Sequence, residues 1–223
     1  MTPDRETVVP VEPSGPSGPS ASGPPDGAAA DPRLNIVPLD PSLWPALVAL
    51  FDRPGDPRWC WCAYWRRPGA SWASHDAAEN REALRSLAGA PIPPGLLALR
   101  DGIATGWVAV APRSEYIRLE RSRTIPHLPG EAVWSVTCFV VAKEARRSGV
   151  ARALLDAAVD FAREHGATTL EAYPVDAGDA RMPAALAYTG TLGMFERAGF
   201  SVAAETTSRP RPETRRVVVR RTL

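Results

Sequence analysis

The chain has 223 residues, of which 44% are hydrophobic, and it carries a formal net charge of +1 at neutral pH. This length and apolar content suffice for one folded domain, and the near-neutral charge offers no general attraction for nucleic acid or an anionic membrane. No segment has the roughly 18–20 apolar residues of a membrane span, the N-terminus lacks a signal-peptide pattern, and three cysteines do not suggest a disulfide framework. We therefore expect a cytoplasmic protein.

The first 32 residues differ in composition from the rest of the chain. They contain eight proline, four glycine and four serine residues and few large apolar ones. Such a segment cannot bury enough apolar surface to offset the conformational entropy lost on ordering. We expect residues 1–32 to form a disordered leader, with an interaction tail as the alternative, and residues 33–223 to form the folded domain.

The first half of this domain predicts strands and helices in alternation. A short strand is expected at residues 34–40 ("LNIVPLD"), and a helix at 41–52, where leucines recur at helical spacing. The aromatic segment 58–69 ("RWCWCAYWRRPG") fits no simple element, and a second helix is expected at 71–89. Two apolar runs about an Asp-Gly pair in residues 95–113 indicate a β-hairpin.

The second half is organised around a fully apolar strand at residues 132–142, of the kind found at the centre of a sheet. A long amphipathic helix, a strand at 168–176, a short helix at 188–200 and a final strand at 215–223 follow. The order β-α-α-β-β-β-α-β-α-β-β predicts a mixed α/β sheet. The arginine-rich last strand is interpreted as a sheet edge and not as an RNA-binding surface.

The junction between the central strand and the long helix has the features of a phosphate site. Ser148 is a candidate N-cap, and Gly149 lets a bulky group approach the main chain. The first amides of a helix have no partner within the helix, and the helix dipole there favours negative charge. The junction lacks the Lys-Ser/Thr pair of a P-loop and the three glycines of a dinucleotide fingerprint. An ordinary turn with incidental arginines remains the alternative.

The pattern Arg146-x-x-Gly149-x-Ala151 after an apolar strand resembles the R/Q-x-x-G-x-G/A signature of the GCN5-related N-acetyltransferase (GNAT) superfamily. The later segment "GMFERAGF" resembles that family's "lYeklGF" segment. The resemblance covers roughly residues 33–223. It implies a mostly antiparallel, twisted sheet with flanking helices, in which acetyl-CoA lies in a splay between the central strand and its neighbour.

The resemblance also implies how acetyl-CoA is held as co-substrate. Amides at the start of the long helix would bind the pyrophosphate, and the end of the central strand would pair with the pantetheine arm, where one amide would polarise the thioester carbonyl. The implied cofactor-binding residues are Phe139, Val140, Val141, Arg146, Arg147, Ser148, Gly149, Val150, Ala151 and Arg152.

Catalytic residues are less clearly indicated. Many relatives use a tyrosine as general acid where this chain has Phe195, so that role is absent at the matching position. Tyr188 and Tyr173 are the substitutes by position, and Tyr188 is the candidate acid; a phenol that packs in the core or lines the substrate site is the alternative for both. Glu171, on the strand beside the expected splay, is the candidate base, with Glu131 as the runner-up; a solvated surface carboxylate is the alternative for both.

The sequence leaves the acceptor open among a polyamine, an amino sugar, an antibiotic and a protein amine. The aromatic residues Trp59, Trp61, Tyr64 and Trp65 are expected to line the acceptor site or else to pack in the core, and they favour a small molecule. No metal site is expected, because Cys60, Cys62 and Cys138 lack metal-ligand spacing. We expect acetyl transfer to a primary amine by direct attack in a ternary complex. A non-catalytic acyl-CoA sensor or assembly component is the second hypothesis, and the assembly state, monomer or homodimer, is left open.

Overall fold

The computed structural model of the protein describes residues 33–54, 57–176, 178, 184–211 and 214–223. Residues Asp31–Leu223 form one compact unit. The leader expected at residues 1–32 lies outside the described residues.

The N-terminal elements combine one edge strand with helices that cover the sheet. Asp40 accepts hydrogen bonds from the amides of Ser42 and Leu43 and so starts the helical segment that follows the first strand. Asp76 and Glu79 form a reciprocal capping box at the next long helix. These elements are β1 (Leu34–Pro38), η1 (Pro41–Leu43), α1 (Trp44–Phe51), α2 (Pro57–Cys60), η2 (Gly69–Ser74) and α3 (Ala77–Leu87).

The expected β-hairpin is present as β2 (Gly95–Arg100) and β3 (Ile103–Pro112). Its turn residues Asp101 and Gly102 both have positive φ, 50° and 78°, which is the backbone that an Asp-Gly pair favours in a tight hairpin. The sequence did not indicate the two short helices that follow, η3 (Arg113–Glu115) and α4 (Ile117–Glu120).

The second half begins with the apolar central strand and the long helix. The remaining elements are β4 (Val133–Val141), η4 (Lys143–Ala145), α5 (Val150–Glu164), β5 (Thr169–Ala172), β6 (Val175–Asp176), η5 (Ala184–Thr189), α6 (Leu192–Arg197), β7 (Ser201–Glu205) and β8 (Arg215–Thr222). In the described residues, these strands complete an open sheet of eight strands in which β4 and β5 are parallel and the other ladders are antiparallel. The mixed, mostly antiparallel sheet is therefore confirmed.

The last strand, however, is not a sheet edge, and that interpretation was wrong. β8 pairs with β5 and β6 on one side and with β7 on the other. Val217, Val218 and Val219 are fully buried, because both faces of the strand are covered. Two of its arginines, Arg216 and Arg220, consequently point into the protein and make bonds there.

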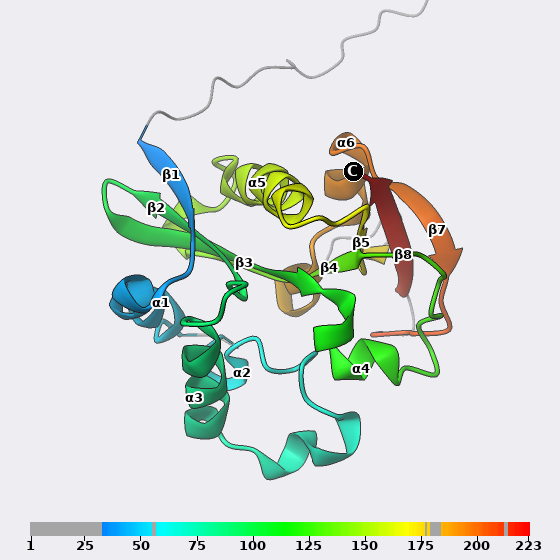
Figure 1. Ribbon diagram of the computed structural model, residues 1–223, viewed down its shortest axis with the longest axis horizontal. Coiled ribbons are helices and arrows are strands. Elements are labelled where there is room, and N and C mark those ends of the chain that lie inside the picture. The colour runs from blue at the N-terminus through cyan, green and yellow to red at the C-terminus, as the bar shows by residue number, and fades with distance from the viewer. Residues whose placement is uncertain (1–32, 55–56, 177, 179–183, 212–213) are drawn as a thin grey trace, which may run out of the picture. The chain divides into compact units, whose positions relative to one another are not determined.

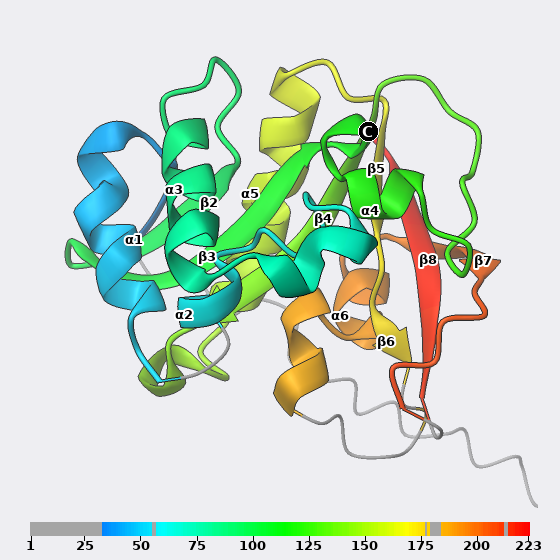
Figure 2. The ribbon, with the colours of Figure 1, turned by 90° about the horizontal axis from the view of Figure 1, so that it is seen from below.

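Helices cover both faces of the sheet. α5 lies along one face, and α1, α3 and α4 lie on the other (Figures 1 and 2). The face of α5 that meets the sheet is apolar and buried, as its amphipathic sequence predicts. Leu154 on α5 is fully buried on this side of the sheet, and Trp107 on β3 is fully buried on the other side, against Phe51 of α1.

Candidate active site

The turn before α5 leaves the first amides of that helix without a side-chain cap. Gly149, at the N-cap position, has a φ of 83°, and Arg147 also has a positive φ of 61°. The expectation that Ser148 caps the helix was wrong: its hydroxyl donates instead to the carbonyl of Ala145 at 2.8 Å. A Cβ added at Gly149 would meet no atom within 4 Å. The turn is therefore open on the side where an anion would approach.

The sheet splits beside this turn. The parallel pairing of β4 with β5 runs from Val133 to Val136 and ends there, opposite Ala172. A register shift places Thr137 as an extra residue in β4, because Val110 pairs with Val136 and Ala109 with Cys138. Such a bulge bends the strand and increases its twist. The end of β4 thus continues along β3 while β5 diverges from it.

The predicted pantetheine-binding residues occupy that diverging end. Phe139, Val140 and Val141 pair with β3 through Val108, Trp107 and Gly106. In an antiparallel ladder, alternate residues turn their amide and carbonyl away from the partner strand. The end of β4 thereby presents main-chain groups to the splay, on the same side of the sheet as the N-terminus of α5.

Phe195 lies in the core and not at the site. Its ring is fully buried and makes edge-on contacts with Phe139 and Phe200, at centroid distances of 6.2 and 5.1 Å. α6 is joined to α5 by a hydrogen bond from Arg152 to the carbonyl of Arg197 at 2.9 Å. A phenylalanine here packs α6 against the central strand and has no proton to give.

Tyr188, the candidate acid, lies on η5 next to the open end of β4. Its side chain is partly buried against the core, and the groups that act on its pKa besides burial are Arg216, Tyr64 and Cys138. Burial raises the pKa of Tyr188 to about 12. The phenol is therefore protonated at neutral pH, which is the state that a proton donor needs.

Glu171, the candidate base, is fully buried on β5 in a network of ion pairs. One carboxylate oxygen accepts from Arg113 at 2.7 Å and also from the hydroxyl of Tyr173, and the other accepts from Arg220 at 2.6 Å. Both oxygens are thus occupied by donors. Burial, followed by the charge of Glu171, raises the pKa of Tyr173 well above its usual value. The runner-up Glu131 is exposed just before β4.

Most of the aromatic segment 58–69 packs in the core. Trp61 is buried against Trp44 and Phe51, whereas Trp59 is 51% exposed. Trp65 is buried in a second core cluster, stacked on Tyr173, and the partly buried Tyr64 meets it edge to face at 5.0 Å.

Sequence reasoning missed two arginines that lie beside these rings. The guanidinium of Arg118 lies 3.9 Å from the ring centre of Tyr64, and that of Arg216 lies 5.5 Å from the ring centre of Trp65. Nothing in the sequence marks these two among 25 arginines.

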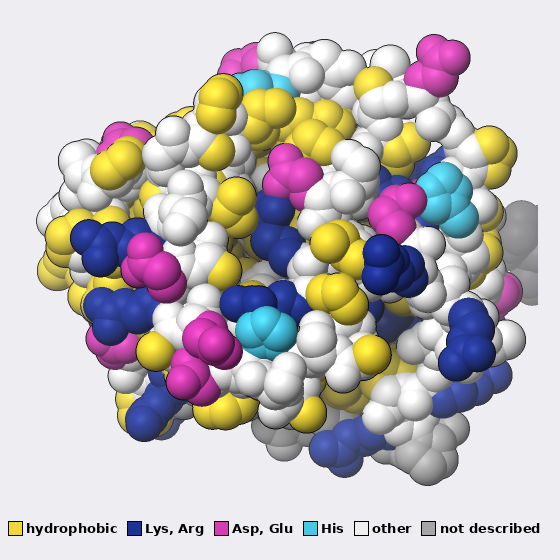
Figure 3. Space-filling model, turned by 60° about the horizontal axis from the view of Figure 1, so that its bottom comes forward, with side chains coloured by type: hydrophobic (Ala, Val, Ile, Leu, Met, Phe, Trp, Pro, Cys, Tyr) yellow, Lys and Arg dark blue, Asp and Glu magenta, His cyan; other side chains and the backbone are white. Residues whose placement is uncertain are grey.

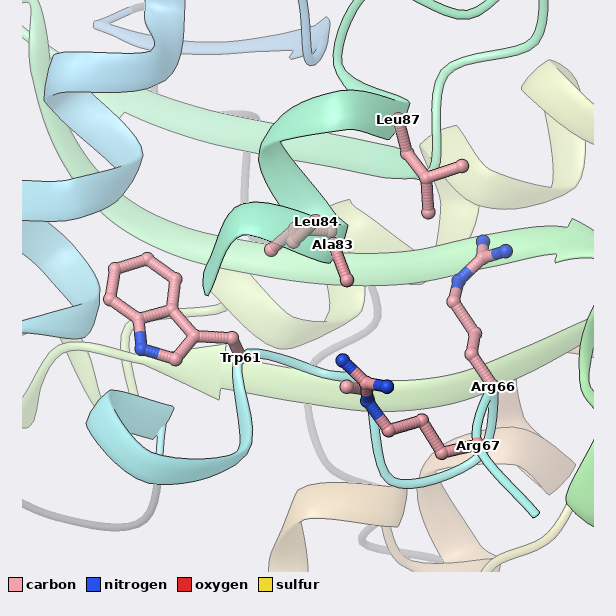
Figure 4. A pocket seen from close by; sticks show the side chains of 7 residues that line it. Trp61, Arg66, Arg67, Ala83, Leu84 and Leu87 are labelled. Atoms are coloured by element: carbon pink, nitrogen blue, oxygen red, sulfur yellow. The ribbon is translucent and has the colours of Figure 1, made fainter. Parts of the chain in front are cut away.

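A cavity of about 310 Å³ opens on the face of the sheet away from α5, between α3 and the segment around Arg66. In Figure 4, Arg66 and Arg67 extend from that segment toward α3, and Trp61 closes the other end. Arg66 pairs with Glu115, and Arg67 donates to Asn80 at 2.8 Å. Figure 3 shows this face of the molecule, with basic side chains set back near its centre between acidic and hydrophobic ones.

The described residues contain neither a metal-binding cluster nor a membrane-spanning helix. Among the described residues, no group of three or more His, Cys, Asp or Glu side chains is arranged to hold a metal ion. None of the described helices is long and apolar enough to cross a membrane. The thiol of Cys138 is buried in the core, and its contact with Cys62, together with burial, raises its pKa. A buried thiol of this kind is a poor nucleophile.

Comparison with known proteins agrees with this geometry. A family model described as Acetyltransferase (GNAT) family matches residues 48–200. No curated protein matches the sequence significantly.

Solved structures with a similar fold include three bacterial proteins. A proposed GNAT-family acetyltransferase from Desulfovibrio desulfuricans is 19% identical, with a TM-score of 0.53 over 85% of this chain and 98% of its own. A GCN5-related N-acetyltransferase from Kribbella flavida is 22% identical, with a TM-score of 0.51 over 86% and 98%. The ribosomal-protein-alanine N-acetyltransferase of Brucella melitensis is 19% identical, with a TM-score of 0.51 over 85% and 99%. At these identities the likeness establishes the fold.

Proposed function

The chain belongs to the acetyltransferase (GNAT) family, and we propose that it transfers an acetyl group from acetyl-CoA to the primary amine of a small acceptor by direct attack in a ternary complex. The observation that carries this proposal is the uncapped N-terminus of α5 beside the splay of β4 and β5. Uncapped amides and the helix dipole together favour a diphosphate at this position.

The residues present fit acetyl-CoA along its length. The amides of Gly149, Val150 and Ala151 would bind the diphosphate, since no side chain caps this helix and the space over Gly149 is open. Arg146 and Arg147 are exposed on the preceding turn and add positive charge. Main-chain groups at Phe139 to Val141 would pair with the pantetheine arm, and one amide there would donate to the thioester carbonyl.

Proton transfer would rely on Tyr188 and not on a dedicated carboxylate base. Tyr188 is protonated at neutral pH and lies beside the open end of β4, so it can donate to the departing thiolate. We do not extend a base role to Glu171, because both of its oxygens already accept from guanidinium groups. The acceptor would then enter as the neutral amine.

One observation favours the second candidate, a non-catalytic acyl-CoA sensor. The position at which many relatives have a tyrosine acid is Phe195, and its ring is packed in the core. The sensor would bind CoA with the same residues but would release no thiol from acetyl-CoA with any amine.

The chain offers a matched pair of glycines to test the diphosphate site. Gly149 and Gly166 flank the two ends of α5, have φ of 83° and 81°, and each has open space where a Cβ would lie. Gly149→Ala and Gly166→Ala should therefore each cost about 1 kcal/mol of stability, through backbone strain alone. Gly149→Glu should weaken CoA binding roughly 100-fold, whereas Gly166→Glu should leave it unchanged.

Isothermal titration with CoA measures both affinities, and urea unfolding checks that each variant is folded. Equal CoA affinity in the folded Gly149→Glu and Gly166→Glu proteins would show that the diphosphate does not bind at this helix terminus. Release of CoA thiol from acetyl-CoA with an amine panel separates the transferase from the sensor.

A further inference from the structure

Two arginines on the acceptor side of the splay have no carboxylate partner among the described residues. Arg66 pairs with Glu115, Arg113 with Glu120 and Glu171, and Arg220 with Glu171, so three carboxylates balance these three cations. Arg118 and Arg216 form no such pair in the described part of the chain. Their charges are not balanced by a carboxylate of the described residues, in contrast to those three.

Arg216 is the more deeply placed of the two, with only 4% of its surface exposed. Its guanidinium donates to the carbonyl of Tyr173 and lies over the ring of Trp65. The phenols of Tyr188 and Tyr64 also act on its charge. None of these partners is a carboxylate. A buried charge without a counter-charge is costly, and burial accordingly lowers the pKa of Arg216.

Arg118 approaches the same place from α4. Its Nε donates to the carbonyl of Tyr64 at 2.7 Å, and the guanidinium covers that ring and lies 5.6 Å from the ring centre of Trp72. One terminal nitrogen of Arg118 is buried and makes no hydrogen bond. Tyr64 thus lies under the guanidinium of Arg118, and its neighbour Trp65 lies under that of Arg216.

The position of this pair relates it to the reaction. Arg216 is bonded to Tyr173, the residue directly after β5 leaves β4, and it is a neighbour of Tyr188, which in turn lies near Cys138 on the open end of β4. The two cations therefore border the splay on the face opposite α5. CoA, bound at the α5 N-terminus, would approach from the other face.

We propose that the acceptor is an amine that also carries a carboxylate, and that Arg216, assisted by Arg118, binds that carboxylate; this inference rests on the proposed acetyl transfer. A carboxylate would supply the missing counter-charge and bond to the terminal nitrogen of Arg118 that has no partner. The same cations disfavour an ammonium ion nearby, so they lower the pKa of the bound amine and promote the neutral nucleophile without a carboxylate base. Polyamines and other polycations are poor acceptors for this site.

The test uses acceptors that differ only in the carboxylate. L-alanine, L-phenylalanine, β-alanine and 4-aminobutyrate are each compared with their carboxamides, and tryptamine and spermidine serve as amines without a carboxylate. We expect kcat/KM to favour the acid of at least one pair roughly 10- to 100-fold, mainly through KM. The amine of an α-carboxamide is the more acidic of its pair, so the fraction of neutral amine cannot produce this preference.

Variants of Arg216 assign the preference to its charge. Arg216→Met should reduce the preference for the acid to near unity, and the charge-keeping Arg216→Lys should retain part of it. CoA affinity, measured by titration, should be the same in both variants as in the native protein, because the diphosphate site lies at α5. Urea unfolding confirms that the variants fold, and Arg118→Met provides a second test should Arg216→Met be unstable.

The outcomes separate the inference from the function on which it rests. The inference is wrong if thiol release favours spermidine or the carboxamides. It is also wrong if the preference for the acid survives both Arg→Met changes. Either result leaves the proposed acetyl transfer standing. Absence of thiol release with every amine overturns the proposed function. In that case, the native and Arg216→Met proteins, both saturated with CoA, are titrated with the same four acids. Binding that is lost in the variant supports a carboxylate site at Arg216. Equal binding to both proteins, or no binding to either, refutes it.

Discussion

At the scale of single residues, Glu171 and Tyr188 differ in their surroundings. The carboxylate oxygens of Glu171 accept hydrogen bonds within the protein, whereas Tyr188 lies next to the open end of β4. Both oxygens of Glu171 accept from arginines, so the carboxylate holds β5 to η3 and β8. The phenol of Tyr188 borders the splay, and its raised pKa keeps the proton in place. Glu171 therefore stabilises the fold, whereas Tyr188, beside the open end of β4, can act on a substrate.

Replacing Tyr188 by phenylalanine tests the proposed acid. We expect kcat for acetyl transfer to fall roughly 10- to 100-fold, because the departing thiolate loses its donor. A donor with a pKa of about 12 loses its proton only as the pH rises through that value, so the native enzyme should show no descending alkaline limb up to about pH 10. Tyr173→Phe, which removes a buried hydroxyl bonded to Glu171, serves as control and should affect stability more than rate. A descending limb that persists unchanged in Tyr188→Phe would assign the acid to another group.

Replacing Glu171 by glutamine separates a structural role from a catalytic one. The change removes a buried negative charge and leaves Arg113, 4% exposed at its side chain, without its closest partner. We expect a loss of about 3–5 kcal/mol in the free energy of unfolding, measured in urea. Glu131→Gln, at an exposed position, should stay within about 0.5 kcal/mol of the native protein. A fully stable Glu171→Gln protein whose slow rate at neutral pH recovers at high pH would restore the general-base role.

At the scale of elements, the position of the α5 N-terminus depends on a glycine in the strand beneath it. A Cβ at Gly106 on β3 would lie 2.6 Å from Val150 Cγ1 and 2.9 Å from Leu154 Cδ1. These distances are too short for any real contact, so the first turn of α5 can lie this close to the sheet only over glycine. Because Gly106 pairs with Val141, the same close contact sets the helix terminus against the open end of β4.

Gly106→Ala should therefore act on both stability and CoA binding. We expect overpacking to cost about 1–3 kcal/mol, and CoA affinity to fall because the first turn of the helix is displaced. Val150→Ala removes the nearest colliding methyl group, so the double variant should be more stable, and should bind CoA more tightly, than the sum of the single changes predicts. Urea unfolding and titration of the four proteins complete the cycle. Strict additivity would show that this close contact does not position α5.

The sequence predicted the elements that repeat a local pattern and failed where partners lie far apart in the chain. The Asp-Gly hairpin, the apolar central strand and the amphipathic α5 follow from periodicity and turn chemistry, and all three are present. Ser148 was misassigned as a cap because a cap depends on which atom the hydroxyl reaches, and here it reaches Ala145. The final strand was misplaced at an edge, since the sequence cannot show that β7 would pair with its outer side.

At the scale of the whole molecule, the bulk charge conceals how charge is distributed. The first 32 residues contain one arginine and five acidic residues, so the net charge of +1 divides into −4 there and +5 on the rest. Within the folded part, Arg216 and Arg220 point inward from β8, which is buried on both faces, and Arg113 reaches inward from η3 to Glu171. The resemblance to acetyltransferases could suggest the CoA site from one motif, but no local pattern distinguishes a buried arginine from the many exposed ones.

Removal of residues 1–30 tests whether the folded part depends on the acidic leader. Their composition predicts that they bury little surface. The amide of Asp101 donates a hydrogen bond to the carbonyl of Arg33 at 3.4 Å, just before β1 begins to pair with β2 at Leu34. We therefore expect the free energy of unfolding of the shortened chain, measured in urea, to lie within about 0.5 kcal/mol of the native value. We also expect it to bind CoA equally well. The KM for carboxylate-bearing acceptors should also be unchanged. A lower KM in the shortened chain would mean that the acidic leader competes with the acceptor for the arginines beside the splay. A loss of stability well beyond 0.5 kcal/mol would instead show that residues 1–30 pack against the domain, contrary to what their composition predicts.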